Sequence, residues 1–360
     1  MRMRTTGLLA VGLLLLAVSL PSAVIRRPAA RPQITRPPLV SRLAGQAELR
    51  AKIVQAVKAA RPFQAGEAIP VYRLAPVTRD QVAARAMELA NRMLPTLGCR
   101  PLAAADLAAD DDYLLAKPSG SVKVRAYLPS GFISVMDQDR VFQGKCAPLS
   151  EQQGAAVALA FIKEQNLVRL LPGERLTSAG CRRISTFGVR AEDGQRQEPT
   201  LSSLVVLVGR ELAGRPVIGP GGRVVVFLGG KGEVVGLQRN WREVLPGSAA
   251  KVQALSLEVV VDRVMKELTA LGGGKLPPAG SVVVERAECG YLAGGKHVTQ
   301  AFLQPAYALH VVMRVEQGPQ LARVVIVPAG DKLLEPLVSG PGEAKGVIRP
   351  SAKPEPGGDE

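Results

Sequence analysis

The residues that most often act as catalytic bases are scarce in this chain. Only two histidines, His297 and His310, occur in 360 residues, and each lies in or beside a run typical of a β-strand. Nucleophilic catalysis by serine needs a hydroxyl beside a base that a third group orients. The sequence contains neither a GxSxG elbow nor an HExxH pair. We therefore predict no catalytic residue and no enzyme activity.

Two further patterns suggest ion or phosphate binding at first sight. Asp110, Asp111 and Asp112 are consecutive, so they do not all point at one ion, and no glutamate follows at the spacing of a calcium loop. The glycines at 219–222 and 229–232 stand between strand-like runs, whereas a phosphate-binding loop leads from a strand into a helix. We interpret the first as a solvated loop and the others as turns, and predict no metal and no cofactor.

The four cysteines, Cys99, Cys146, Cys181 and Cys289, form no CxxC pair and fit no zinc-binding spacing. An even number of cysteines in a secreted chain favours disulfides. We expect Cys99–Cys146, which flank one stretch of chain, and Cys181–Cys289. Buried free thiols are the alternative, because cysteine also serves as a small core residue.

The only tryptophan, Trp241, stands beside two arginines, Arg239 and Arg242, at the end of a strand-like run. Tryptophan and arginine dominate the energetics of protein interfaces, so these three residues are a candidate interaction anchor. The alternative, which we favour, is a tryptophan that caps the core with guanidinium groups stacked on its ring.

Helix-start signals place three helices in the chain. Thr78 and Ser150 each precede a Gln at the third following position, the pattern of a capping box, and Ser256 precedes a third apolar-periodic run. Runs typical of strands surround and follow these helices at 71–74, 121–128, 131–137, 201–211, 223–228, 233–240, 281–287, 306–314 and 322–327. Glycine turns join the runs between 201 and 240, which predicts an antiparallel meander.

The pattern predicts an α+β fold made of repeated units of one helix packed on a small antiparallel sheet. The units span residues 71–147, 148–250 and 251–335. A tail over 336–360, rich in glycine, proline and charge, is expected to be disordered. The hydrophobic fraction of 47% fits a folded protein with a core.

Residues 1–23 have the three-part layout of a secretory signal peptide. Arg2 and Arg4 precede an apolar run from Gly7 to Leu20, and Pro21-Ser-Ala ends it. The run is shorter than a membrane-spanning helix requires. An uncleaved N-terminal anchor is the alternative, because Pro21 stands where a cleavage site prefers a small residue. Either form places the protein outside the cytoplasm, secreted or anchored to the cytoplasmic membrane.

A basic arm follows the leader. Residues 24–70 hold nine Lys and Arg against Glu48 and Glu67, out of a net charge of +15 for the chain, with one short helix expected at 47–60. Such an arm suits anionic wall polymer or lipid, and the alternative is a solvated linker. The leader argues against nucleic acid as a partner.

The segments 209–210, 214–217, 222–226 and 232–236, with the run Gln304–Leu309, resemble a PepSY-type unit. They are similar to extracytoplasmic regulatory proteins of the YycI/YycH kind and to the propeptide domains of secreted metalloproteases, over about residues 71–330. The resemblance implies a non-catalytic envelope module that binds or regulates another protein, such as a protease or sensor. The alternative is a structural protein that binds the wall or lipid through residues 24–70.

Overall fold

The computed structural model describes residues 39–146, 149–186, 198–314 and 320–337. The leader, residues 24–38 of the basic arm and residues 338–360 of the predicted tail lie outside these residues. The helices are α1 (Leu39–Ala59), α2 (Arg79–Met93), α3 (Gln138–Phe142), α4 (Glu151–Glu164) and α5 (Leu257–Leu271). Among the described residues, no helix combines the length and the apolar character that crossing a bilayer requires.

The strands are β1 (Ala68–Arg73), β2 (Ala108–Ala109), β3 (Tyr113–Ala116), β4 (Val122–Tyr127), β5 (Phe132–Asp137), β6 (Glu174–Thr186), β7 (Thr200–Leu212), β8 (Arg215–Ile218), β9 (Arg223–Leu228), β10 (Val234–Asn240), β11 (Ala250–Gln253), β12 (Val282–Leu292), β13 (Phe302–Met313) and β14 (Leu321–Pro328). They form one hydrogen-bonded sheet of 14 strands, twelve of which follow the order β11-β1-β13-β12-β8-β7-β9-β10-β5-β4-β3-β2. In addition, β6 pairs with β7 and β14 pairs with β13.

The predicted architecture of separate helix-on-small-sheet units is therefore wrong. Strands of different predicted units pair directly: Leu237 of β10 faces Val135 of β5, and Tyr72 of β1 faces Leu303 of β13. In the strand order, the short strand β8 stands between β12 and β7. It runs antiparallel to β7 and parallel to β12, and so connects the strands on either side of it into one sheet. The predicted antiparallel meander is confirmed, because β7, β9 and β10 pair antiparallel in this order. The strand β8, which lies between β7 and β9 in the chain, was not predicted. The sequence marks where strands begin, but strand partners far apart in the chain leave no local signal.

The helix starts are confirmed. Thr78 and Ser150 each accept a hydrogen bond from the backbone N–H of a Gln three positions on, and the side-chain oxygen of each Gln accepts one from the backbone N–H of the cap. Ser256 caps α5 through the N–H of Val259. These caps fix where α2, α4 and α5 begin, and so which side chains each helix presents to the sheet.

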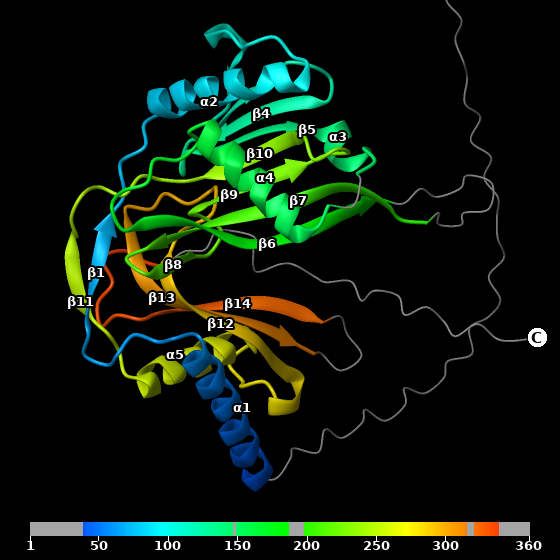
Figure 1. Cartoon of the computed structure of the whole chain (residues 1–360). Coiled ribbons are helices and arrows are strands. Elements are labelled where there is room, and N and C mark those ends of the chain that lie inside the picture. Colours follow the sequence, from blue (N-terminus) through cyan, green and yellow to red (C-terminus); the bar gives the residue numbers. More distant parts are fainter. Residues whose placement is uncertain (1–38, 147–148, 187–197, 315–319, 338–360) are drawn as a thin grey trace, which may run out of the picture. The chain divides into compact units, whose positions relative to one another are not determined.

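Two core clusters lie between helices and strands. One holds the apolar faces of α2 and α4 against β3–β5, β7, β9 and β10, and the other packs α1 and α5 against β1 and β11–β14. In Figure 1, α2 and α4 cover the same side of the green and cyan strands, whereas α1 and α5 lie against the orange and yellow strands.

Helix α1 occupies much of the interval predicted as a basic arm. It is longer than the short helix expected at 47–60, and Leu49, Ile53 and Val57 on one of its sides are fully buried in the core shared with α5. Two of its basic residues are engaged as well, since Arg50 pairs with Asp262 of α5 and Lys52 pairs with Glu48. Residues 49–57 are thus part of the folded core.

Candidate functional site

A small cavity opens between α2, β10 and the loop that follows α4. Its volume is about 60 Å³, enough for a few water molecules or a small polyatomic anion. Its walls mix charged and apolar side chains, namely Arg85, Glu88, Leu89, Arg92, Ile133, Asn166, Leu167 and Arg239.

Local structure explains how these residues meet. Arg85, Glu88 and Arg92 recur at spacings of three and four along α2, so they share one side of the helix. Arg239 stands two positions after Leu237 and two before Trp241, which both belong to the core under α2 and α4. Its side chain therefore points to the helix-covered side of the sheet.

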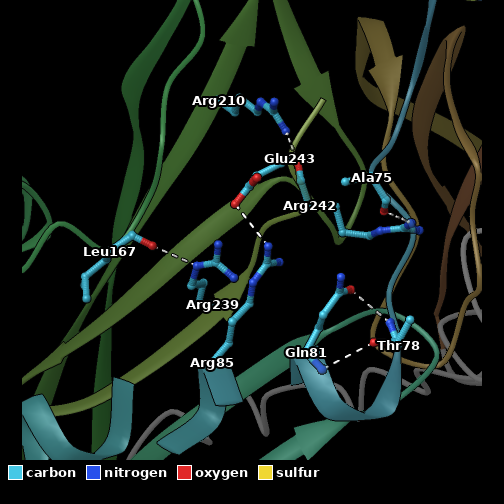
Figure 2. Close-up of polar contacts among 9 residues, drawn as sticks. All are labelled: Ala75, Thr78, Gln81, Arg85, Leu167, Arg210, Arg239, Arg242 and Glu243. Atoms are coloured by element: carbon cyan, nitrogen blue, oxygen red, sulfur yellow. Dashed lines mark hydrogen bonds and ion pairs between the residues drawn. The ribbon is translucent and has the colours of Figure 1, made fainter. Parts of the chain in front are cut away.

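The loop after α4 supplies the third wall. Asn166 adopts a left-handed backbone conformation, with φ of +48°, which reverses the chain directly after the helix. This reversal aims the carbonyl of Leu167 at the guanidinium of Arg239 (Figure 2).

Arg239 forms the buried end of the cavity. Only 7% of the residue is exposed, and its Nε donates to the Leu167 carbonyl at 2.8 Å. Among the described residues, its two Nη atoms have no hydrogen-bond partner. Burial, and then the like charge of Arg85, lowers the pKa of Arg239 to about 10, so the group stays protonated at neutral pH.

The other two arginines of the wall have carboxylate partners. Arg85 Nη2 lies 3.2 Å from Glu243 Oε1, and Arg92 pairs with Glu88 one turn earlier on α2. Figure 2 shows the guanidinium groups of Arg85 and Arg239 next to each other, with Glu243 on Arg85 only. Three arginines share two carboxylates, so one positive charge in excess remains at the cavity.

The predicted interaction anchor is divided by the fold. Trp241 is 1% exposed, so it offers no surface to a partner, and the guanidinium carbon of Arg210 lies 4.6 Å from its ring centroid. Arg242 donates to the Ala75 carbonyl at 2.6 Å and to the Gln300 carbonyl. Of the three residues, Arg239 alone lines the cavity.

Sequence reasoning missed Arg85, Glu88 and Arg92. Their signal is a charged row at helical spacing, which reads as an ordinary solvated helix face. Only the pairing of β10 with β5 brings Arg239 beneath that row, and this pairing joins segments about a hundred residues apart.

Neither predicted disulfide is formed. Cys99, Cys181 and Cys289 are free thiols, and Cys289 lies buried in the core of α1 and α5. Burial raises the pKa of Cys289 to about 11. The Sγ atom of Cys146 lies 3.2 Å from the carbonyl oxygen of Gly229.

The residues set aside by the sequence analysis occupy ordinary structural positions. His310 Nε2 lies 3.0 Å from Glu288 Oε2 on neighbouring strands, and His297 packs edge-on against Tyr127. The glycine clusters at 219–222 and 229–232 join β8 to β9 and β9 to β10, as turns. Within the described residues, no three His, Cys, Asp or Glu side chains gather as metal ligands.

Comparisons with known proteins add little to this description. No family model and no curated protein matches the chain. Among solved structures, an uncharacterized protein from Eubacterium rectale is similar with a TM-score of 0.47 and 11% identity, over 74% of this chain and 84% of that one. A likeness this distant assigns neither a fold family nor an activity to the chain.

Proposed function

We propose that the protein is a non-catalytic binding module that acts outside the cytoplasmic membrane and holds an anionic group of its partner in the Arg239 cavity. The buried guanidinium of Arg239 carries this proposal. Arg239 lines the cavity, and its two Nη atoms have no hydrogen-bond partner among the described residues. A buried charge is costly unless an opposite charge and hydrogen bonds compensate it, and a bound anion supplies both.

The surrounding charges favour the same kind of ligand. Arg85 and Arg92 line the cavity beside Arg239, and their two carboxylate partners leave an excess of positive charge. A recess with an excess of positive charge raises the local concentration of anions. Anions are therefore drawn to the mouth of the cavity before they reach Arg239.

The location and the role of a binding module come from the sequence. The leader over residues 1–23 predicts export, and the PepSY-like resemblance over about 71–330 implies binding or regulation of an envelope protein. The cavity adds a specific contact to that proposal, since it offers the partner a charged anchoring point.

Titration calorimetry with inorganic phosphate, sulfate and acetate tests the anion site at constant ionic strength. The comparison uses the wild-type chain, Arg239→Met and the matched control Arg125→Met, which removes an exposed arginine of β4 outside the cavity. Saturable binding of at least one anion by the wild type and the control, lost in Arg239→Met, supports the site. Equal heats for all three chains contradict it.

The non-catalytic part has its own test. Peptide, ester and glycoside substrates are incubated with the wild-type chain and with the variants His310→Ala and Glu288→Gln. These two residues form the one His–carboxylate hydrogen bond in the part of the chain that the structure describes. No turnover is expected. Hydrolysis by the wild type that either substitution abolishes would contradict the proposed binding role.

A further inference from the structure

We infer that the anion held at Arg239 is a carboxylate with one negative charge, carried on a short aliphatic stem. This inference rests on the proposed function, because it assumes that the cavity binds an anion. It narrows the ligand from any anion to one chemical class, through charge, hydrogen-bond geometry and the apolar part of the wall.

The charge of the site matches a monoanion. Glu243 compensates Arg85 and Glu88 compensates Arg92, which leaves the charge of Arg239 as the excess. One carboxylate neutralises that excess. A phosphate dianion would leave a second negative charge beside Glu88 in a partly buried site, where an uncompensated charge is costly.

The orientation of the guanidinium also matches a carboxylate. The hydrogen bond from Nε to the Leu167 carbonyl occupies one side of the group and fixes its plane. The two Nη atoms then present parallel N–H donors, which fit the two oxygens of a carboxylate in a bidentate pair. Such a charge-assisted pair is stronger than hydrogen bonds between neutral groups.

The rest of the wall suits a hydrocarbon stem. Leu89, Ile133 and Leu167 line the cavity and are each at least nine-tenths buried. A methylene chain gains contact with these side chains, whereas the oxygen atoms of sulfate or phosphate would lose hydrogen bonds to water there. The exposed residues Glu88, Arg92 and Asn166 mark the opening through which the stem leaves.

Two sources carry this chemistry. One is a free short-chain carboxylic acid, and the other is an acidic side chain of a partner polypeptide, whose backbone would stay outside the opening. Both present the same carboxylate and stem to Arg239, so the site alone does not separate them. Suitable probes do.

The test measures binding of propionate, propionamide, inorganic phosphate and N-acetylglutamate N-methylamide by titration calorimetry, with the full chain at neutral pH. Propionate is expected to bind more tightly than phosphate and propionamide by about tenfold or more, the worth of a charge-assisted bidentate pair. The substitution Arg239→Met should abolish propionate binding, and Arg125→Met should leave it unchanged. Arg239→Lys, which keeps the charge without the fork, should bind propionate more weakly than the wild type.

The outcomes separate the inference from the proposed function. Phosphate binding that exceeds propionate binding and depends on Arg239 overturns the inference and leaves the anion site intact. Equal binding of propionamide and propionate also overturns it. If Arg239→Met changes the binding of none of these anions, both the inference and the proposed anion site are wrong. Binding of the blocked glutamate at least as tight as that of propionate identifies a polypeptide source, and binding of propionate alone identifies a free acid. Circular dichroism spectra that match the wild type show that each variant is folded.

Discussion

The guanidinium of Arg210 on β7 covers the ring of Trp241, 4.6 Å from its centroid, in the interior of the protein. The same guanidinium pairs with Glu174 at the start of β6 and donates to the Arg242 carbonyl at 2.8 Å. Both partners of the ion pair are buried, at 1% and 0% exposure of their side chains. Arg210 thus ties β6, β7 and the segment after β10 together, near enough to Arg239 for the two like charges to interact.

This buried pair leads to a first prediction, on stability. Glu174→Gln leaves the charge of Arg210 uncompensated in the core, which should lower the free energy of unfolding by about 3–5 kcal/mol. The matched control is Glu211→Gln, because Glu211 pairs at 2.7 Å with Arg175, whose side chain is 70% exposed, on the same two strands. We expect about 1 kcal/mol or less there.

Urea denaturation followed by circular dichroism measures the free energy of unfolding of Glu174→Gln and of Glu211→Gln. A loss for Glu174→Gln no larger than that for Glu211→Gln would contradict the role given to Arg210. The double variant Glu174→Leu with Arg210→Met removes both charges, and we expect it to recover part of the loss, since it leaves no unpaired ion.

A second prediction concerns α1. Ile53 is fully buried in the core with α5, so Ile53→Ala should destabilise the chain by about 2–5 kcal/mol. Gln55 on the same helix is exposed, and Gln55→Ala should change the stability by no more than about 0.5 kcal/mol. Thermal unfolding of the two variants makes the comparison. Equal stabilities would show that α1 does not contribute to the core.

The position of α1 also shapes any experiment on the basic arm. Deleting residues 24–70 would remove Leu49, Ile53 and Val57 from the core and unfold the protein, whatever the arm binds. A deletion confined to residues 24–38 leaves this helix intact. Retention on anionic wall polymer or lipid is therefore a valid readout only for the shorter deletion.

The three helix starts were predictable because capping is local: Thr78 and Gln81 lie within one turn and signal α2 by themselves. The strand β6 was missed for the opposite reason. Its sequence, from Glu174 to Thr186, has few apolar residues and no strict alternation, and it forms a strand because it lies against β7.

The assembly of the candidate site could not be predicted from the sequence. In the sequence, Arg239 stood out only because it lies near Trp241. In the structure, its surroundings are the charged residues of α2 and the carbonyl of Leu167.

A third prediction concerns the thiols. Cys289 is 3% exposed with a pKa raised by burial to about 11, so it should resist iodoacetamide in the native chain. Cys99 and Cys181 are only partly buried and should react earlier, without prior reduction. Mass spectrometry after timed labelling measures the order. Labelling of these cysteines only after reduction would instead establish the disulfides that the sequence suggested.

The same thiol gives stability a pH dependence. The pKa of Cys289 is higher in the folded chain than its ordinary value of 9.0, so the folded state holds the proton more tightly. Below pH 9 this contribution to the free energy of unfolding is fully present. As the pH rises toward 11, the unfolded thiol loses its proton before the folded one, and the free energy of unfolding falls, by about 1 kcal/mol at pH 10. Cys289→Ala should lose less stability than the wild type between pH 8 and pH 10 in urea titrations. Parallel pH profiles would contradict the raised pKa.

The last prediction is the pH range over which a carboxylate binds at Arg239. Binding needs a deprotonated ligand and a protonated guanidinium. For a glutamate side chain, affinity should fall below the ordinary carboxyl pKa of about 4.3. Burial brings the pKa of Arg239 to about 10, so affinity should fall again as the pH rises through that value, well before an exposed arginine would lose its proton. Between these limits the affinity should be constant.

Calorimetric titrations of N-acetylglutamate N-methylamide from pH 4 to pH 10.5 measure this profile, with circular dichroism at each pH to confirm that the chain is folded. Because a bound anion stabilises the charged guanidinium, binding raises the pKa of Arg239, and the affinity should decline gradually on the alkaline side. An affinity that persists unchanged above pH 10 in a folded chain would mean that the ligand does not depend on the charge of Arg239. The anion would then be held by Arg85 and Arg92 at the mouth of the cavity instead.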